Sequence, residues 1–397
     1  MTIGMNPRKA SLTFSAVVPM YNAELYIQET LESLCSQTYP LEEIIVVDDA
    51  CQDQSAQIVA KWMEQTSIPI KVIRNDRNRG VSYSRNKGFG EASGQWILLL
   101  DADDVVDQTL VETHVQLLAT NEATHAVLCH SAYRQIDEHG NLLPGITQFK
   151  QVGPHEILGY EFVRNHVYLS GTSVHRQTAI EAGLFDLELS HSEDWDLWLR
   201  LAQRGGFLYI NEPLFTVRRH SSNASSHIKS MLDGERRVLQ KYRLEFIKEA
   251  IHRRDLPIVI NAADYVSVLY RLDQYEEGHH YLKQLIAEGH SSASLYFFHG
   301  LYFVICKQFR QAATSFREAL KQDKHHGAAR NNLAAAWGCM GHKEEAIQLL
   351  QEVLSDIPNY MDANHNLTQI QSNPHVTSSD LKWTWRELRP VLLQYSG

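Results

Sequence analysis

The first hundred residues alternate short apolar runs with segments whose apolar residues recur at helical spacing. The apolar runs, each short enough for one strand, cover residues 15–20, 42–49, 70–75 and 95–104. The segments with helical spacing cover residues 23–37, 54–65 and 82–93. Strands and helices that alternate in this way predict an α/β fold, with a mostly parallel sheet and helices on both faces.

Each predicted strand ends in polar residues. These ends are Tyr21-Asn22, Asp48-Asp49, Asn75-Asp76 and Asp101-Ala102-Asp103. In open α/β sheets, ligands bind outside the carboxyl ends of the strands. The sequence therefore predicts a ligand site at this edge of the sheet.

The strongest chemical feature is the Asp-x-Asp pair formed by Asp101 and Asp103 after a run of leucines. Side chains two residues apart on an extended chain point to the same side. Two carboxylates, together with phosphate oxygens, suit Mg²⁺ or Mn²⁺. Such an ion can neutralise a diphosphate leaving group. The alternative is that Asp103 and Asp104 only cap a helix that starts near Val105.

Four motifs occur in a fixed order. They are P-x-Y-N at Pro19, Tyr21 and Asn22; V-D-D at Asp48 and Asp49, with Asp53 beyond it; N-x-G-x-x-x-x-R-N-x-G at Asn78, Gly80, Arg85, Asn86 and Gly88; and D-x-D at Asp101 and Asp103. As a set, they resemble the family 2 glycosyltransferases of the GT-A fold over roughly residues 11–225. The departures are Ala50-Cys51, where Gly-Ser is usual, and Tyr83-Ser84, where small residues are common. The resemblance implies a nucleotide-sugar-binding, Rossmann-like sheet with flanking helices.

The resemblance also implies which residues bind the sugar donor. Tyr21 and one of Asp48 or Asp49 would contact the nucleoside, and Arg85 would lie near the donor. The full donor-binding set is Pro19, Tyr21, Asn22, Asp48, Asp49, Arg85, Asp101 and Ala102. A carboxylate can accept from a base N–H or a ribose hydroxyl, an aromatic ring can stack on the base, and arginine can pair with phosphate. Each of these residues could instead be a turn-former or a helix cap.

Glu193 and Asp194 stand just before a predicted helix, whose buried stripe would be Trp195, Trp198, Leu199 and Ala202. The family has an E-D-x-x-L-x-x-R-like segment at this point, and its aspartate is the proposed general base. The resemblance therefore implies Asp194 as the base, with Glu193 as its neighbour or alternate. An inverting transfer needs one carboxylate to take the proton of the attacking hydroxyl. The alternative is that Asp194 is only an N-cap.

A third segment, FTVRRHSSNASSH, follows this helix at residues 215–227. The family often has an Arg/His-Ser segment here. His220 could complete the metal site with Asp101 and Asp103, or contact the diphosphate, and Arg218 or Arg219 could do the latter too. An exposed loop histidine is the alternative. The Ser/Asn-rich end of the segment suits a loop that closes over the donor.

From about residue 256 the pattern changes to successive helices with a 34-residue period. Small residues recur at one position and large residues four further on, as at Gly278, Ala312 and Ala346 and at Leu282, Phe316 and Leu350. This pattern resembles the tetratricopeptide (TPR) repeat. We predict a catalytic domain over 11–230, a linker helix over 231–255, TPR-like repeats over 256–372 and a helical tail over 373–397. The linker helix either packs on the catalytic domain or contacts an anionic membrane or lipid-linked acceptor.

Composition narrows the class of protein. Lys and Arg number 37 and Asp and Glu 47, so the formal charge is 37 − 47 = −10, which argues against general nucleic-acid binding. Five scattered cysteines indicate reduced thiols in a cytosolic protein. We see no signal peptide and no run of 18 apolar residues, and expect a cytoplasmic protein. Peripheral attachment at the inner face of the membrane is left open.

The leading hypothesis is an inverting, metal-dependent glycosyltransferase that uses Mn²⁺ or Mg²⁺. Its donor would be a nucleotide sugar, UDP- or GDP-linked, and its acceptor a glycan, a lipid-linked molecule or a protein. The repeats could bind a protein partner. One alternative is a non-catalytic TPR scaffold with a degenerate nucleotide-binding domain. Another is a nucleotidyltransferase, which would release pyrophosphate from a nucleoside triphosphate.

Overall fold

The computed structural model describes residues 12–120, 125–220 and 228–386. The chain divides into two compact units, Met1–Arg243 and Leu244–Gly397. In the described part of the chain, no helix is both long and apolar enough to cross a bilayer.

The N-terminal unit begins with the predicted alternation. Its first four strands are β1 (Phe14–Met20), β2 (Glu43–Asp48), β3 (Ile70–Arg74) and β4 (Trp96–Leu99). The helices between them are α1 (Ile27–Cys35), α2 (Ser55–Gln65) and α3 (Val81–Glu91). These strands pair in parallel, with β1 between β2 and β4. Apolar side chains of β1, β2, β4 and α1 share one core, which explains why the apolar runs form the buried strands.

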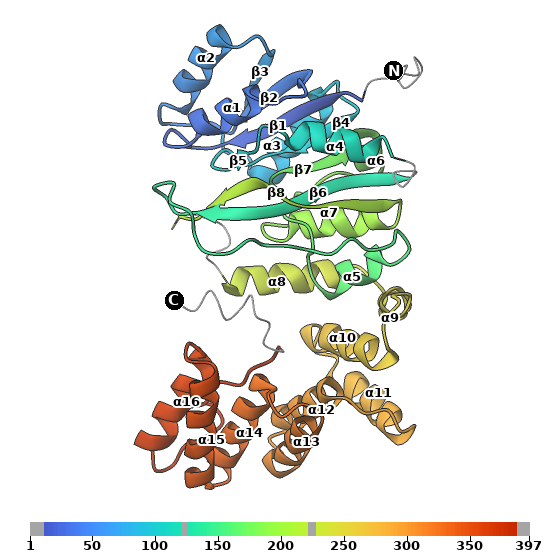
Figure 1. Ribbon diagram of the computed structural model, residues 1–397, viewed down its shortest axis with the longest axis vertical. Helices are drawn as coiled ribbons and strands as arrows, with labels where there is room; N and C mark the ends of the chain where they lie inside the picture. Colours follow the sequence, from blue (N-terminus) through green and yellow to red (C-terminus); the bar gives the residue numbers. More distant parts are fainter. Residues whose placement is uncertain (1–11, 121–124, 221–227, 387–397) are drawn as a thin grey trace, which may run out of the picture. The chain divides into compact units, whose positions relative to one another are not determined.

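The sheet then becomes mixed, in the order β3-β2-β1-β4-β7-β6-β8-β5 (Figure 1). The added strands are β5 (Val105–Val106), β6 (Ala126–Ile136), β7 (Thr172–His175) and β8 (Gly206–Arg218). β7 runs antiparallel to both β4 and β6, whereas β8 runs parallel to β6. The predicted strand over 95–104 is too long, because β4 ends at Leu99 and a turn separates it from β5.

The other helices of this unit are α4 (Leu110–Leu118), α5 (Ile157–Val163), α6 (Arg176–Glu181), α7 (Glu193–Ala202) and α8 (Ile228–Leu239). Helix α7 buries all four residues of its predicted stripe, including Trp195 and Trp198. The strand register brings the polar ends of the first three strands together at one edge of the sheet. Met20 lies beside Asp48, and Asp48 beside Arg74, so the carboxyl ends of β1, β2 and β3 meet.

The C-terminal unit consists of helices joined by short turns (Figure 1). They are α9 (Leu244–His252), α10 (Ile258–Arg271), α11 (Tyr275–Ala287), α12 (Ala293–Ile305), α13 (Phe309–Gln322), α14 (Gly327–Cys339), α15 (Lys343–Asp356) and α16 (Met361–Ser372). Small residues stand where helices cross closely. A Cβ added at Gly300 would lie 2.5 Å from the Phe316 ring. The 34-residue period therefore reflects close helix packing.

Two expectations for the second half of the chain are wrong. The predicted single linker helix over 231–255 is broken between α8 and α9, where Lys241 binds two aspartates. The predicted helical tail over 373–397 is not helical in its described part, residues 373–386. Pro374 cannot donate a helical hydrogen bond, and the residues beyond it bind side chains of α14 and α16 instead.

Candidate active site

Three carboxyls gather in the turn after β4. Asp101, Asp103 and Asp104 each offer one oxygen atom, and these atoms lie within 4.8 Å of one another. Asp101 and Asp103 are partly exposed, whereas Asp104 is buried. Burial and the neighbouring carboxyls raise the pKa of Asp103, and raise that of Asp104 well above its ordinary value. Grouped carboxylates that repel one another favour a cation between them.

Asp104 and Asp103 differ in their partners. Asp104 accepts a hydrogen bond from the backbone N–H of Arg218 at 2.9 Å, so it ties the turn to the end of β8. Asp103 lies 2.8 Å from Nε2 of His220. The alternative, that Asp103 and Asp104 only cap a helix, is wrong, because the two-residue strand β5 follows them.

His220 reaches the acidic turn from the far end of β8. The His220 ring stacks on the Tyr26 ring, with centroids 5.3 Å apart. The Arg218 guanidinium lies 4.8 Å from the centre of the Tyr26 ring. Arg218 also binds Glu29. The histidine is therefore held beside Asp103 rather than left on an exposed loop. Its role as a metal ligand stays a prediction, and the predicted closing loop at 221–227 lies outside the described residues.

Arg85 joins the acidic turn to helix α7. This buried side chain donates from Nη2 to Asp101 at 2.7 Å and from Nη1 to Glu193 at 2.9 Å. Its guanidinium also lies 5.3 Å from the Phe185 ring centre. Burial opposes the charge on Arg85, but the two carboxylates outweigh it and raise the pKa. The Arg85 guanidinium thus joins Asp101, which was predicted to bind the donor, to Glu193, the neighbour of the predicted base.

Asp194 is the second residue of α7, and its carboxylate accepts two hydrogen bonds. Asn165 donates from Nδ2 at 2.9 Å, and the backbone N–H of Trp195 donates at 2.7 Å. Burial and the charge of Glu193 raise the pKa of Asp194 to about 7, against the opposing effect of these bonds and of Arg85. Ser192 occupies the N-cap position, so the N-cap alternative for Asp194 is wrong. A carboxyl that titrates near neutral pH is suited to proton transfer.

Two residues beside Asp194, Asn165 and Glu161, were not predicted from the sequence. The Asn165 amide holds the Asp194 carboxylate by its hydrogen bond. Glu161 on α5 is fully buried, and its backbone carbonyl accepts from Nε1 of Trp195 at 2.7 Å. Burial raises the pKa of Glu161 well above its ordinary value, and the charge of Asp194 adds to the effect. No local sequence pattern marks either residue, because only the tertiary fold brings α5 and the segment after it to α7.

The predicted nucleoside-binding residues lie together at the ends of β1 and β2. Tyr21 is half exposed, whereas Asp48 and Asp49 are buried. Asp48 accepts from the backbone N–H of Cys51 at 2.8 Å. Asp49 accepts from the side chain of Asn75 and from two backbone N–H groups of the turn before α3. Both aspartates therefore shape the edge in this structure, and their donor contacts stay predictions.

The remaining members of the donor set have structural contacts of their own. Pro19 lies within β1, and Asn22, at a φ of 48°, accepts from the backbone N–H of Gln52. Ala102 is buried, and its carbonyl accepts from the Thr30 hydroxyl at 3.0 Å. These contacts fix the turns that carry Tyr21 and Asp101. The donor contacts of these residues stay predictions.

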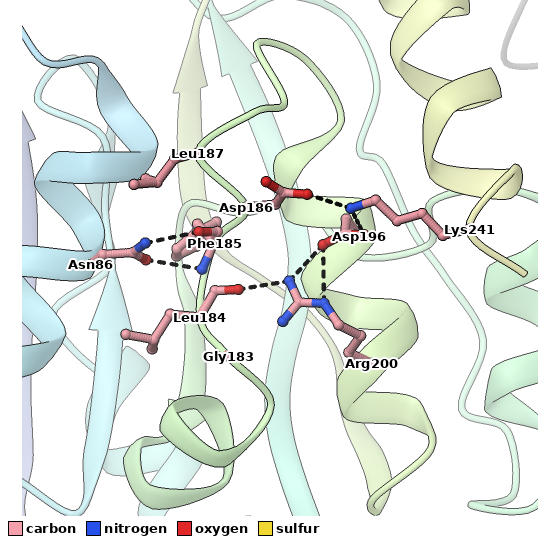
Figure 2. Close-up of a pocket in the computed structure, with 9 residues that line it drawn as sticks. All are labelled: Asn86, Gly183, Leu184, Phe185, Asp186, Leu187, Asp196, Arg200 and Lys241. Carbon is pink, nitrogen blue, oxygen red and sulfur yellow. Dashed lines mark hydrogen bonds and ion pairs between the residues drawn. The ribbon is translucent and has the colours of Figure 1, made fainter.

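A cavity of about 520 Å³ lies beside the site rather than at the acidic turn (Figure 2). Lys241 binds Asp186 at 2.5 Å and Asp196 at 2.7 Å on one side of it, and Arg200 binds Asp196 at 2.6 Å. On the other side, the Asn86 amide exchanges two hydrogen bonds with the backbone of Phe185. This network fixes the loop whose Phe185 ring packs on Arg85, so we interpret it as support for the site.

Comparison with known proteins gives this arrangement a family. The family model Glycosyl transferase family 2 matches residues 15–178. An uncharacterized glycosyltransferase of Methanocaldococcus jannaschii is 30% identical over 222 residues, which span 54% of this chain and 74% of that protein. This chain belongs to glycosyl transferase family 2. A second relative, the putative glycosyltransferase EpsH of Bacillus subtilis, is 30% identical over 242 residues, 59% of this chain and 69% of that protein.

The fold and the repeats also have matches. The crystal structure of TarS 1–349 from S. aureus, in complex with UDP-GlcNAc, has a TM-score of 0.50 and 19% identity. The match covers 79% of this chain and 90% of that chain. A tetratricopeptide repeat model matches residues 307–370. The predicted GT-A fold and TPR resemblance are confirmed, and this family 2 member is a glycosyltransferase.

Proposed function

We propose that this glycosyltransferase inverts the anomeric carbon as it moves a sugar from a nucleoside diphosphate to a hydroxyl group. The observation that carries the proposal is the Arg85 bridge, which joins Asp101 of the acidic turn to Glu193, next to Asp194. A UDP- or GDP-linked sugar is the proposed donor. In support of that class, the structure of similar fold, TarS, was crystallised with UDP-GlcNAc.

Asp194 is the proposed general base. Its carboxylate takes the proton of the acceptor hydroxyl while the hydroxyl oxygen forms its bond to the anomeric carbon. The bond from that carbon to the diphosphate breaks, and the diphosphate leaves with the electron pair. The N–H groups of Asn165 and Trp195 orient the carboxylate. A pKa of about 7 leaves Asp194 partly ionised at neutral pH and basic enough to accept the proton.

Asp101, Asp103 and His220 are the proposed ligands of a divalent cation, Mn²⁺ or Mg²⁺. The residues fit such an ion, because carboxylate oxygens lie within 4.8 Å of one another and the His220 Nε2 lies 2.8 Å from Asp103. The cation, when bound, supplies neutralisation of the leaving diphosphate. Asp104 is assigned to support, because it is buried and accepts from the Arg218 backbone.

Calorimetry tests the donor site. UDP, GDP, CMP and dTDP and their sugars are titrated into the full chain with Mn²⁺ or Mg²⁺, for wild type and for Asp103→Asn. We expect one nucleoside diphosphate to bind only with metal, and Asp103→Asn to weaken this at least tenfold. Asp107→Asn is the matched control, because this exposed aspartate caps the next turn. Nucleotide binding that needs no metal, or that survives Asp103→Asn unchanged, would contradict the metal assignment.

A separate experiment tests the base. Asp194→Asn keeps the shape of the side chain but cannot take a proton. We expect kcat to fall by about 10²–10⁴-fold with little change in donor binding. The anomeric configuration of the product, read by NMR, tests inversion independently. Retention of configuration would refute the single-displacement mechanism.

Each predicted domain has a proposed role. Residues 11–230 would carry the transferase chemistry, and residues 256–372 would recognise a partner or acceptor. The acceptor class remains a glycan, a lipid-linked molecule or a protein. A cytoplasmic location is likewise a proposal that rests on sequence alone.

A further inference from the structure

A second cavity lies in the repeat unit, on helices α12 and α13. Its volume is about 610 Å³. Sites for small organic molecules span about 300–1,000 Å³, so the cavity has room for a sugar rather than for an inorganic ion alone. The lining residues are His299 and Phe303 of α12 and Arg310, Gln311, Thr314 and Ser315 of α13.

The His299 ring in this cavity is held in one orientation. Its Nδ1 lies 3.0 Å from the hydroxyl of Ser315, which is buried, and the ring stacks on His279 of α11 with centroids 5.1 Å apart. Burial lowers the pKa of His299 to about 4, and the charges of His279 and Lys283 add to the effect. The imidazole is therefore neutral at neutral pH. A hydroxyl group both donates and accepts, so it can bond to the second ring nitrogen in either tautomer.

The other lining side chains also suit a sugar. Gln311 and Thr314 are exposed, and an amide and a hydroxyl each offer donors and acceptors. The Thr314 hydroxyl donates to the Arg310 carbonyl at 3.1 Å, which leaves its lone pairs for a ligand. Phe303 is partly exposed and packs edge-on to the His299 ring, with centroids 4.9 Å apart. An aromatic ring presents an apolar surface to the C–H groups of a pyranose.

Positive charge at the cavity has no counter-charge in the protein. Among the described residues, neither Arg310 nor Lys283 forms an ion pair. The carboxylate of Glu276 is already engaged, because it accepts from the Tyr302 hydroxyl at 2.8 Å. The chain as a whole has a formal charge of −10, so two unpaired cations here run against its overall charge. Arginine pairs with carboxylate or phosphate through two parallel hydrogen bonds, which indicates a ligand with such a group.

We propose that this cavity is a binding site for an acidic sugar, built from other residues than the candidate active site. The carboxylate or phosphate group of the sugar pairs with Arg310. Its hydroxyls bond to His299, Gln311 and Thr314, and its ring packs on Phe303. Uronic acids and sugar phosphates share this chemistry. The proposal concerns the repeat unit alone and goes beyond sugar transfer at the candidate active site.

The test is a ligand-observed NMR titration of the full chain, without nucleotide and with EDTA to keep the proposed metal site empty. The probes are glucuronate, glucose 6-phosphate, neutral glucose and inorganic phosphate. We expect one acidic sugar to bind at least tenfold more tightly than glucose and than inorganic phosphate, and its identity names the anionic group. Arg310→Gln should weaken this binding at least tenfold, because the charged hydrogen bonds are lost.

Two further variants locate the binding. Thr314→Phe fills the cavity from an exposed position, so it should also weaken the acidic sugar at least tenfold. Arg317→Gln is the matched control, an exposed arginine on the same helix outside the cavity lining, and should bind as wild type does. Equal affinity for acidic and neutral sugar, inorganic phosphate that binds as tightly as the sugar, or full affinity in Arg310→Gln and Thr314→Phe would each overturn the proposal. An equal loss in Arg317→Gln would also overturn it, because general charge attraction would then explain the binding.

Discussion

The hydrogen bond from Asn165 to Asp194 gives the sharpest test of the proposed base. We choose Asn165→Ser, because serine can still accept from the backbone N–H of Val167, as Asn165 does at 3.1 Å, but is too short to reach Asp194. The bond favours the ionised form of Asp194. Its loss should therefore raise the pKa of Asp194 further above its value of about 7.

The size of the effect follows from the contact. A hydrogen bond to a charged group contributes about 1.5–3 kcal/mol. Asp194 is partly exposed, so we discount this to roughly half, about 0.7–1.5 kcal/mol. Since 1.36 kcal/mol corresponds to one pH unit, the pKa should rise by about 0.5–1 pH unit.

The assay is kcat/KM for sugar transfer from pH 5.5 to 8.5. Because the base must be ionised, the rate should fall as the pH drops through the pKa of Asp194. The variant should lose about three- to tenfold relative to wild type at pH 6, and little at pH 8.5. Asn141→Ser is the matched control, since Asn141 donates to Asp137 at the same 2.9 Å in the exposed turn after β6. An equal loss at every pH would mean that Asn165 acts only on structure, and an unshifted acidic limb would refute Asp194 as the titrating base.

Three other substitutions have definite expected outcomes. Arg85→Lys keeps the charge but cannot bridge two carboxylates with a planar fork, so kcat/KM should fall by about 10–100-fold; unchanged kinetics would refute the bridge. Gly300→Ala should destabilise the repeat unit by about 1–3 kcal/mol in urea titration, because its Cβ would meet Phe316, and unchanged stability would show that the ring moves freely. His220→Ala should weaken Mn²⁺ binding about tenfold, as measured by electron paramagnetic resonance. Unchanged Mn²⁺ affinity would mean that Asp103 and the other carboxylates suffice as ligands.

Local sequence determined much of the fold. The alternation of apolar runs and helical segments specifies β1 to β4 and the helices between them, because burial on both faces requires continuous apolar strands. The 34-residue period specifies the repeats, because small residues are needed at each helix crossing. The polar strand ends also marked the acidic turn, since parallel strands bring their carboxyl ends to one edge.

Tertiary structure alone decided the rest. The order of β7, β6 and β8 depends on pairing between distant segments, and this pairing brings Asn165 and Glu161 to Asp194. The Arg85 bridge spans 108 residues of sequence to Glu193, and no periodic pattern encodes it. The residues after Pro374 were predicted to be helical, yet asparagines on α14 and α16 hold them extended. Local propensity fixes what each segment can form, but hydrogen bonds and ion pairs made across the fold fix which side chains meet.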